Sequence, residues 1–388
     1  MPTVESLSSP LAVDLRNGHL VVIRYLTPLC VTIAFAALSQ PAHAEGEKEL
    51  ATYPWLGYAV VREDGKAVVV PVTAPEASSR PLWLWDPVTD KRTKILPKGL
   101  AEADIVYAMP SADGKSFLVR SRSERSKFTT LTLFDVVSGK ELGSAKGEGN
   151  LLPEPYCTAL TPDGTRLACR RNNKVDGIIL LLDLKTGKSE EIATKDGDFA
   201  RPTFSADGEY LAATTWGRHK ITGPLADGIT VWETKTWKVT REFRVDTEDV
   251  QLFAISPDAK TLVAIGSPVT GKEWNLRMWS LETGKQVWNL SRVQQTPRDP
   301  SPLGGLAFGK KGEIVAVGTP GAVLILDAAT GKETASVKLP HAEKLGSRGQ
   351  IGPVTAHRLS LSPDGKLLAV TFEYGMHTKI YDISELKK

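Results

Sequence analysis

The chain has 388 residues, of which 41% are hydrophobic and 24% charged, and its formal net charge is +3 at pH 7. These values are ordinary for a soluble globular protein. A nucleic-acid-binding domain is usually much more basic, so we expect no nucleic-acid partner. The 33 Gly and 25 Pro residues are spread evenly and favour many short strands joined by turns.

The first 44 residues differ in character from the rest. Residues 24–44, RYLTPLCVTIAFAALSQPAHA, contain an arginine, an apolar run from Leu26 to Leu38, a proline, and Ala-His-Ala before Glu45. This order is typical of a signal peptide, and the apolar run is too short to span a bilayer comfortably. We predict a signal peptide over residues 1–44, with its true start near Val21, and an exported chain over residues 45–388. An uncleaved membrane anchor is the alternative.

Two cysteines remain in the predicted exported chain. Cys157 and Cys169 lie six residues either side of Asp163, the centre of a predicted turn. The two ends of an antiparallel hairpin lie opposite each other, within reach of a disulfide, and an oxidising compartment allows the bond to form. We predict the pair as a disulfide candidate. The alternative is two small buried thiols.

A short phrase recurs along the exported chain. It reads TALTPDGTRLAC at Thr158, PTFSADGEYLAA at Pro202, FAISPDAKTLVA at Phe253 and LSLSPDGKLLAV at Leu359. The seven central positions are 44 to 53 residues apart, a period typical of propellers and solenoids. These positions are Asp64, Asp113, Asp163, Asp207, Asp258, Lys311 and Asp364.

A second motif follows each of these turns, as in LWLWDPVTDK at Leu82 and VLILDAATGK at Val323. An acidic residue follows the aromatic or aliphatic residue in six of the seven units, with Ser280 as the exception. Thr or Ser follows three positions later in six units. Asp, Thr and Gly suit hairpin turns because short side chains hydrogen-bond the turn backbone and Gly adopts a left-handed conformation.

Each unit is therefore predicted to contain four antiparallel strands, named a to d. Strands such as GIILLLDL are apolar on both faces, which is expected of a sheet packed between two others. We predict an all-β fold, a single seven-bladed β-propeller of four-stranded blades over residues 45–388. The last unit ends after strand c, so we expect the first mature residues, EKELATY, to supply its outer strand and close the ring.

The paired motifs resemble the WD-repeat family of β-propellers and its bacterial exported relatives, over residues 50–388. Trp85 with Asp86 matches the family dipeptide fully, and Trp232 with Glu233 is a variant of it. Phe134-Asp135, Leu182-Asp183, Leu326-Asp327 and Tyr381-Asp382 are further variants. No unit carries the family's Gly-His pair ahead of strand a, so the chain is described as WD-repeat-like. The resemblance implies a binding surface without catalysis.

We expect function on one face of the propeller. The a–b and c–d turns would occupy one face and the b–c and d–a loops the other, where the sequence varies. The b–c loops expected in units two to four carry nine basic residues against Glu124, Asp176 and Asp227. A positive arc of this kind attracts acidic partners, and the alternative is a solvated rim. The arc comprises Arg120, Arg122, Arg125, Lys127, Arg170, Arg171, Lys174, Arg218 and Lys220, with His219 among them.

Signals for chemistry are few. His341, His357 and His377 are weak metal candidates on the same face, but no HxH, HExxH or CxxC spacing occurs. There is no G-x-S-x-G elbow, P-loop or GxGxxG motif. No catalytic residue, metal or cofactor is therefore assigned.

The sequence thus favours an exported, monomeric interaction scaffold, periplasmic or secreted, that binds a protein or an anionic glycan. The protein is expected to have no stable membrane span after signal cleavage. The alternative is an exported propeller enzyme, a lactonase-like hydrolase or a quinoprotein-like dehydrogenase, with its site at the channel mouth. Convergent carboxylates or histidines around a deep pocket would favour the enzyme.

Overall fold

In the computed structural model, Ala44–Lys388 form one compact unit. Within it, the described residues are 48–53, 57–71, 82–95, 97, 100, 105–111, 113–122, 128–148, 158–170, 178–193, 197–217, 227–244, 248–268, 273–293, 303–309, 312–339, 341–345, 350–353, 356–372 and 377–387. In parts of several strands, and throughout 341–345 and 350–353, only the backbone is described.

The first four blades each consist of four consecutive strands in the order a, b, c, d. Blade 1 contains β2 (Gly57–Val61), β3 (Ala67–Pro71), β4 (Leu82–Asp86) and β5 (Lys91–Ile95). Blade 2 contains β6 (Ile105–Pro110), β7 (Ser116–Arg122), β8 (Phe128–Asp135) and β9 (Glu141–Glu148). Blade 3 contains β10 (Thr158–Leu160), β11 (Arg166–Arg170), β12 (Ile178–Asp183) and β13 (Ser189–Ala193). Blade 4 contains β14 (Gly197–Phe204), β15 (Tyr210–Gly217), β16 (Asp227–Glu233) and β17 (Val239–Arg244).

The remaining blades follow the same order, except that the fourth strand of the last blade is β1, which precedes blade 1 in the sequence. Blade 5 contains β18 (Glu248–Ile255), β19 (Thr261–Pro268), β20 (Glu273–Ser280) and β21 (Gln286–Val293). Blade 6 contains β22 (Gly304–Phe308), β23 (Ile314–Thr319), β24 (Ala322–Asp327) and β25 (Glu333–Lys338). Blade 7 contains β28 (Ala356–Leu361), β29 (Leu367–Phe372), β30 (Thr378–Asp382) and β1 (Lys48–Tyr53). A separate hairpin, β26 (His341–Leu345) with β27 (Gln350–Pro353), and a short 3-10 helix, η3 (Ser384–Lys387), complete the described elements.

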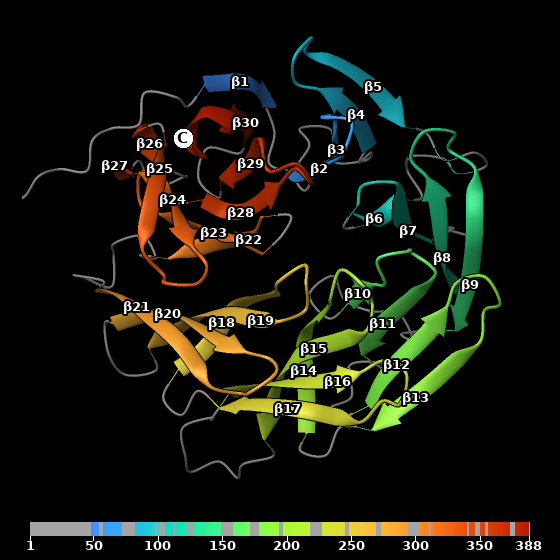
Figure 1. The fold of residues 1–388 in the computed structure, drawn as a ribbon. Helices are drawn as coiled ribbons and strands as arrows, with labels where there is room; N and C mark the ends of the chain where they lie inside the picture. The colour runs from blue at the N-terminus through green and yellow to red at the C-terminus, as the bar shows by residue number, and fades with distance from the viewer. Residues whose placement is uncertain are drawn as a thin grey trace, which may run out of the picture. The chain divides into compact units, whose positions relative to one another are not determined.

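The seven blades form a ring, so this unit is an all-β, seven-bladed propeller, as predicted (Figure 1). The N-terminal strand closes the ring, because β1 pairs antiparallel with β30 and becomes the outer strand of blade 7. Lys48 lies opposite Asp382 and Tyr53 opposite Thr378. Pairing the two ends of the propeller covers an edge of β30 that would otherwise offer unpaired backbone groups to another chain.

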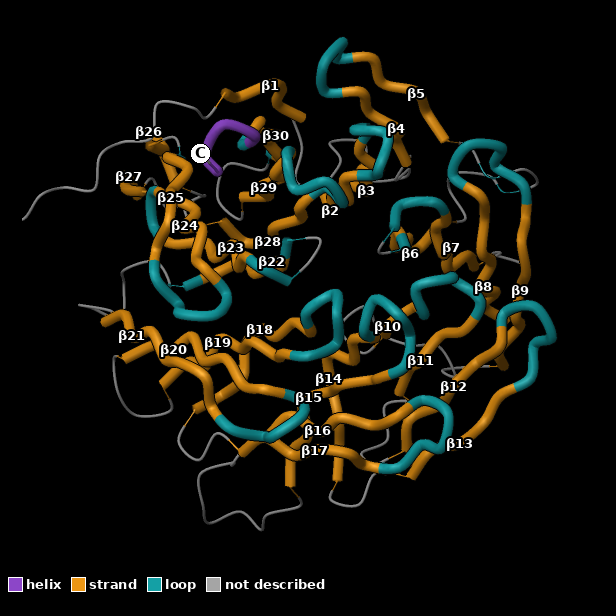
Figure 2. Tube along the Cα trace, in the orientation of Figure 1, coloured by secondary structure: helices purple, strands orange, loops and turns teal. Residues whose placement is uncertain are grey.

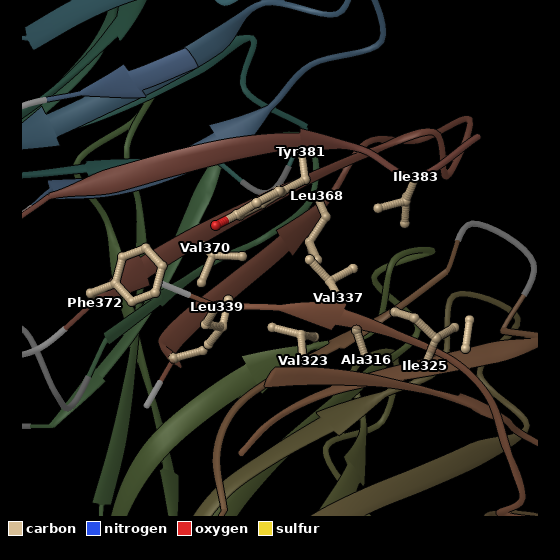
Figure 3. Packing of buried hydrophobic residues seen from close by; sticks show 12 residues of the cluster. Ala316, Val323, Ile325, Val337, Leu339, Leu368, Val370, Phe372, Tyr381 and Ile383 are labelled. Carbon is tan, nitrogen blue, oxygen red and sulfur yellow. The ribbon is translucent and has the colours of Figure 1, made fainter. Parts of the chain in front are cut away.

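The core consists of seven hydrophobic clusters, one in each seam between neighbouring blades. In the seam between blades 6 and 7, Val323 and Val337 pack with Leu368, Val370 and Phe372 (Figure 3). Burying each such side chain stabilises the fold by about 1.5–3 kcal/mol. Since both faces of each blade meet a seam, strands such as β12 carry consecutive buried residues and show no simple alternation.

Five of the seven a–b turns share one hydrogen-bond pattern, which explains the recurring Ser/Thr-x-Asp. In blade 5, the hydroxyl of Ser256 donates to Oδ1 of Asp258 at 2.6 Å and accepts the backbone N–H of Thr261 at 2.9 Å. Asp258 Oδ1 also accepts the backbone N–H of Lys260. Ser111, Thr161, Ser205 and Ser362 make the equivalent bonds in blades 2, 3, 4 and 7. Figure 2 draws these turns among the teal loops.

The c–d turns use the acid of the WD-like pair in a similar way. Oδ1 of Asp135 accepts the backbone N–H and the hydroxyl of Ser138, both at 2.7 Å. Asp327 does the same with Thr330. Gly139 and Gly331 then take positive φ values of 63° and 69°. The Asp, Thr or Ser, and Gly of the repeat are therefore turn residues, as predicted.

Candidate functional site

The two faces of the propeller differ in how constant their connections are. The a–b turn spans five residues in all seven blades, from 62–66 in blade 1 to 362–366 in blade 7. The c–d turn spans five residues in blades 2 to 6 and four in blade 1. The b–c connection ranges from two residues (320–321) to ten (72–81). The d–a connection ranges from three residues (54–56) to seventeen (339–355). We call the a–b and c–d side the turn face, and the other side the loop-rich face.

The aspartates of the repeat motifs are hydrogen-bonded within their own turns. Hydrogen bonds from the backbone N–H and the hydroxyl of Ser138 hold the pKa of Asp135 below its usual value, outweighing desolvation. At Asp163, burial opposes ionisation, but hydrogen bonds from Thr161 and Thr165 still lower the pKa. Lys115, Lys260 and Lys366 each lie within 4 Å of the aspartate in the same turn. These aspartates therefore have a structural role in their turns.

The strands bring the ends of the predicted positive arc to one side of neighbouring blades. Arg122 is the last residue of β7 and Arg170 the last residue of β11, which are the b strands of blades 2 and 3. Both were expected inside loops, and the structure extends the strands to include them because each still pairs with strand c. Their side chains lie outside the described part of the structure. Arg125, Lys127, Arg171, Lys174, Arg218, His219 and Lys220 lie outside the described residues altogether.

Arg120 was also expected in a loop, but the structure places it inside β7, opposite Tyr107 on one side and Leu131 on the other. Its side chain is half-buried. Alternate residues of a strand share a face, and Leu118 packs with Leu167 and Cys169 of blade 3. Arg120 therefore faces the seam between blades 2 and 3, at its loop-rich end. Its Nε is buried, and no described residue accepts a hydrogen bond from it.

Strand a, the innermost strand, is irregular in five blades, where its pairing with strand b shifts register. In blade 4 the shift falls at Arg201, which has a φ of +50°. Its Nη1 donates to the carbonyl oxygen of Val250 in blade 5 at 2.6 Å. Bulges of this kind bend an edge strand and redirect side chains. No sequence signal pointed to this link, because the shift lies before the turn residues that define the repeat motif.

Only one of the three candidate histidines has a described side chain. His377 lies just before β30, half-buried, with its ring centroid 4.7 Å from that of Phe372. The side chains of His341 in β26 and His357 in β28 lie outside the described part. Among the described residues no group of three or more His, Cys, Asp or Glu is placed to hold a metal.

Cys169 is buried and pairs in register with Thr158. Cys157 lies outside the described residues, so the disulfide stays a prediction.

One described insertion distinguishes the loop-rich face. The d–a connection between blades 6 and 7 contains the hairpin β26–β27, in which His341 lies opposite Pro353. The sequence showed this stretch only as a long connection, because HAEKL and QIGP lack a clear alternation of apolar and polar residues.

The chain matches no family model, and the search of curated proteins finds no significantly similar sequence. The seven four-stranded blades are therefore established by strand order and register, and the finer likeness to WD repeats rests on the motifs in the sequence. Within the described residues, no helix is long and apolar enough to cross a membrane.

Proposed function

We propose that this protein is an exported, WD-repeat-like binding scaffold that presents its loop-rich face to an acidic partner, either a protein or an anionic glycan. The observation that carries the proposal is the contrast between the two faces. The turns have nearly constant length and hydrogen-bond their motif aspartates internally, whereas the b–c connections vary from two to ten residues. Variable loops on a rigid frame are where binding residues concentrate.

Charge favours an acidic partner. The b–c connections of blades 2 to 4, with their flanking residues, hold a surplus of six positive charges in neighbouring blades. Such a surplus raises the rate of encounter with an anionic surface and makes binding sensitive to salt. The turn face lacks this surplus where its lysines lie beside aspartates, as Lys260 does at 3.6 Å from Asp258.

The experiment compares charge reversals of equal size on the two faces. Lys127→Glu, Lys174→Glu and Lys220→Glu are combined in one variant, and Lys115→Glu, Lys260→Glu and Lys366→Glu in a matched control. Retention on immobilised polygalacturonate and polyglutamate is measured as a function of salt. We expect the loop-face variant to lose retention on at least one matrix and the control to keep it. Equal losses in both variants would contradict the proposal.

The two matrices also separate the partner classes. Retention on polygalacturonate alone indicates a carboxylated glycan, and retention on polyglutamate alone an acidic protein. Export is tested separately by cell fractionation and by sequencing the N-terminus of the purified protein. The proposal predicts a mature chain that begins at Glu45. A cytoplasmic protein that still carries the residues before Glu45 would contradict it.

A further inference from the structure

Among the described residues, Arg120 lacks the contact by which three other arginines join neighbouring blades, a hydrogen bond from the guanidinium to a carbonyl of the next blade. Arg62 of blade 1 donates to the carbonyl of Gly114 in blade 2, and Arg201 of blade 4 to that of Val250 in blade 5. Arg241 of blade 4 donates to the carbonyls of Leu281 and Glu282 in blade 5. Each of these guanidinium groups is thus held by the adjacent blade.

In contrast, the Nε of Arg120 is buried and meets no acceptor among the described residues. The side chain lies where Leu131, Leu167 and Cys169 line the seam between blades 2 and 3. Arginine remains charged at all relevant pH values. A buried cationic N–H without an acceptor is unfavourable, so its presence requires a compensating role.

We propose that Arg120 binds a carboxylate group of the partner at the loop-rich end of this seam. The inference rests on the proposed function for the identity of the partner, and adds the residue and the chemical group. A guanidinium presents parallel N–H donors that match the two oxygens of a carboxylate. Arg120 supplies one positive charge beside apolar side chains, which a carboxylate monoanion neutralises. A phosphate dianion would leave one negative charge uncompensated in the seam.

The position of Arg120 fits this role. It lies in β7 two residues before the strand ends at Arg122, on the side of the propeller where the b–c connections begin. Strand β7 pairs on both sides at Arg120, with Tyr107 of β6 and Leu131 of β8, although β6 shifts register just before Tyr107. A ligand therefore meets a donor whose backbone is already fixed, and less conformational entropy is lost on binding.

The test measures thermal unfolding of the full chain with chloride replaced by acetate at constant ionic strength and neutral pH. Wild type is compared with Arg120→Met, Arg120→Lys and, as a matched seam arginine, Arg241→Met. We expect acetate to raise the midpoint of wild type more than that of Arg120→Met, with Arg120→Lys between them. The comparison between variants removes the general effect of acetate on stability.

In chloride, Arg120→Met should be at least as stable as wild type, because it removes a buried donor that has no acceptor. Arg241→Met should unfold at a lower temperature in both salts yet keep the acetate increment. Equal acetate increments in wild type and Arg120→Met would overturn the proposal. So would a loss of stability in chloride as large as that of Arg241→Met, which would show that the chain itself supplies the acceptor.

Two further measurements are made: thermal unfolding in phosphate in place of acetate, and polyanion retention of the loop-face variant. A larger Arg120-dependent increment with phosphate than with acetate would overturn the assignment of a carboxylate. Loss of polyanion retention in the loop-face variant, together with equal acetate increments, would reject the role of Arg120 alone. Unchanged retention together with an Arg120-dependent increment would reject the loop-face function and leave the carboxylate site standing.

Discussion

The Nζ of Lys379 lies 2.7 Å from Oε2 of Glu49. This ion pair joins β30 to β1, two strands at opposite ends of the sequence, within blade 7. Arg92 of blade 1 adds a second link, since its Nη2 donates to the carbonyl of Thr52 and its guanidinium lies 5.4 Å from the ring centre of Tyr53. The closing strand is thus fixed by both neighbours.

The ion pair predicts a pH-dependent contribution to stability. Burial opposes ionisation of Glu49, but hydrogen bonds from Lys379 and Thr52 outweigh it and hold its pKa below the usual 4.5. A lowered carboxylate pKa stabilises the fold above the unfolded-state value, and that contribution is lost as the pH falls through the folded-state pKa. We expect Glu49→Gln to reduce the free energy of unfolding by about 0.2–1 kcal/mol at pH 7, because the pair is partly exposed.

Chemical denaturation of wild type and Glu49→Gln at pH 7 and pH 3 measures this difference. The two proteins should be more alike at pH 3 than at pH 7. Thr93→Ser, an exposed change in the neighbouring outer strand, is the control and should leave stability unchanged at both pH values. A difference that grows on acidification would contradict the assigned sign.

Deletion of residues 45–53 should open the ring. The edge of β30 would lose its partner along the register from Lys48–Asp382 to Tyr53–Thr378, and exposed edges promote aggregation. We expect a large fall in the unfolding temperature and concentration-dependent association, measured by light scattering. A synthetic peptide of residues 45–53 should partly restore the monomer, whereas a scrambled peptide should not. A deletion variant as stable as wild type would show that β1 is dispensable.

The indole N–H of Trp288 in β21 donates to the carbonyl oxygen of Ala328 in blade 6 at 2.7 Å. Gly331 lies against this ring, because a Cβ there would come 2.7 Å from Cδ2 of Trp288. Trp288→Phe should reduce the free energy of unfolding by about 1–2 kcal/mol, as it leaves the carbonyl without this donor. The neighbouring Val287, which is 46% exposed, is the control. Val287→Ala should change stability by less than about 0.5 kcal/mol.

Ser256 is fully buried and holds the a–b turn of blade 5. Ser256→Ala should reduce the free energy of unfolding by about 1–3 kcal/mol, because the N–H of Thr261 loses its side-chain acceptor. Burial opposes ionisation of Asp258, but the bond from Ser256 helps to hold its pKa below 3.8. The variant should therefore raise that pKa, which NMR titration of the carboxyl group measures. An unchanged pKa would contradict the role given to the hydroxyl.

The fold could be predicted from the repeat because the motifs that define each turn act locally. The Asp, Thr and Gly of each turn act within a few residues, as Asp135 and Ser138 do, so the recurring motifs and their spacing predicted seven blades and the turn face. The closing strand followed from counting strands in the last unit. Strand ends were less accurate, because β7 continues through Arg120 to Arg122 by pairing with a neighbour that no local signal marks.

For the candidate site, the sequence predicted only which face of the propeller would bind and that this face would be positively charged. Whether an arginine on a strand finds a hydrogen-bond acceptor depends on which carbonyl groups of the next blade lie near it. Arg241 meets Leu281, while the Nε of Arg120 meets no acceptor among the described residues, and nothing in the two local sequences distinguishes these outcomes. Such contacts arise from packing between units some fifty residues apart.

Hydrogen–deuterium exchange with and without a bound acidic polymer shows which face of the propeller the polymer covers. We expect slower exchange at the b–c ends of blades 2 to 4, around residues 120–129, 170–178 and 216–228, with no change in the a–b turns such as 256–260. Slower exchange confined to the a–b and c–d turns would place the partner on the turn face and rule out binding at the loop-rich face.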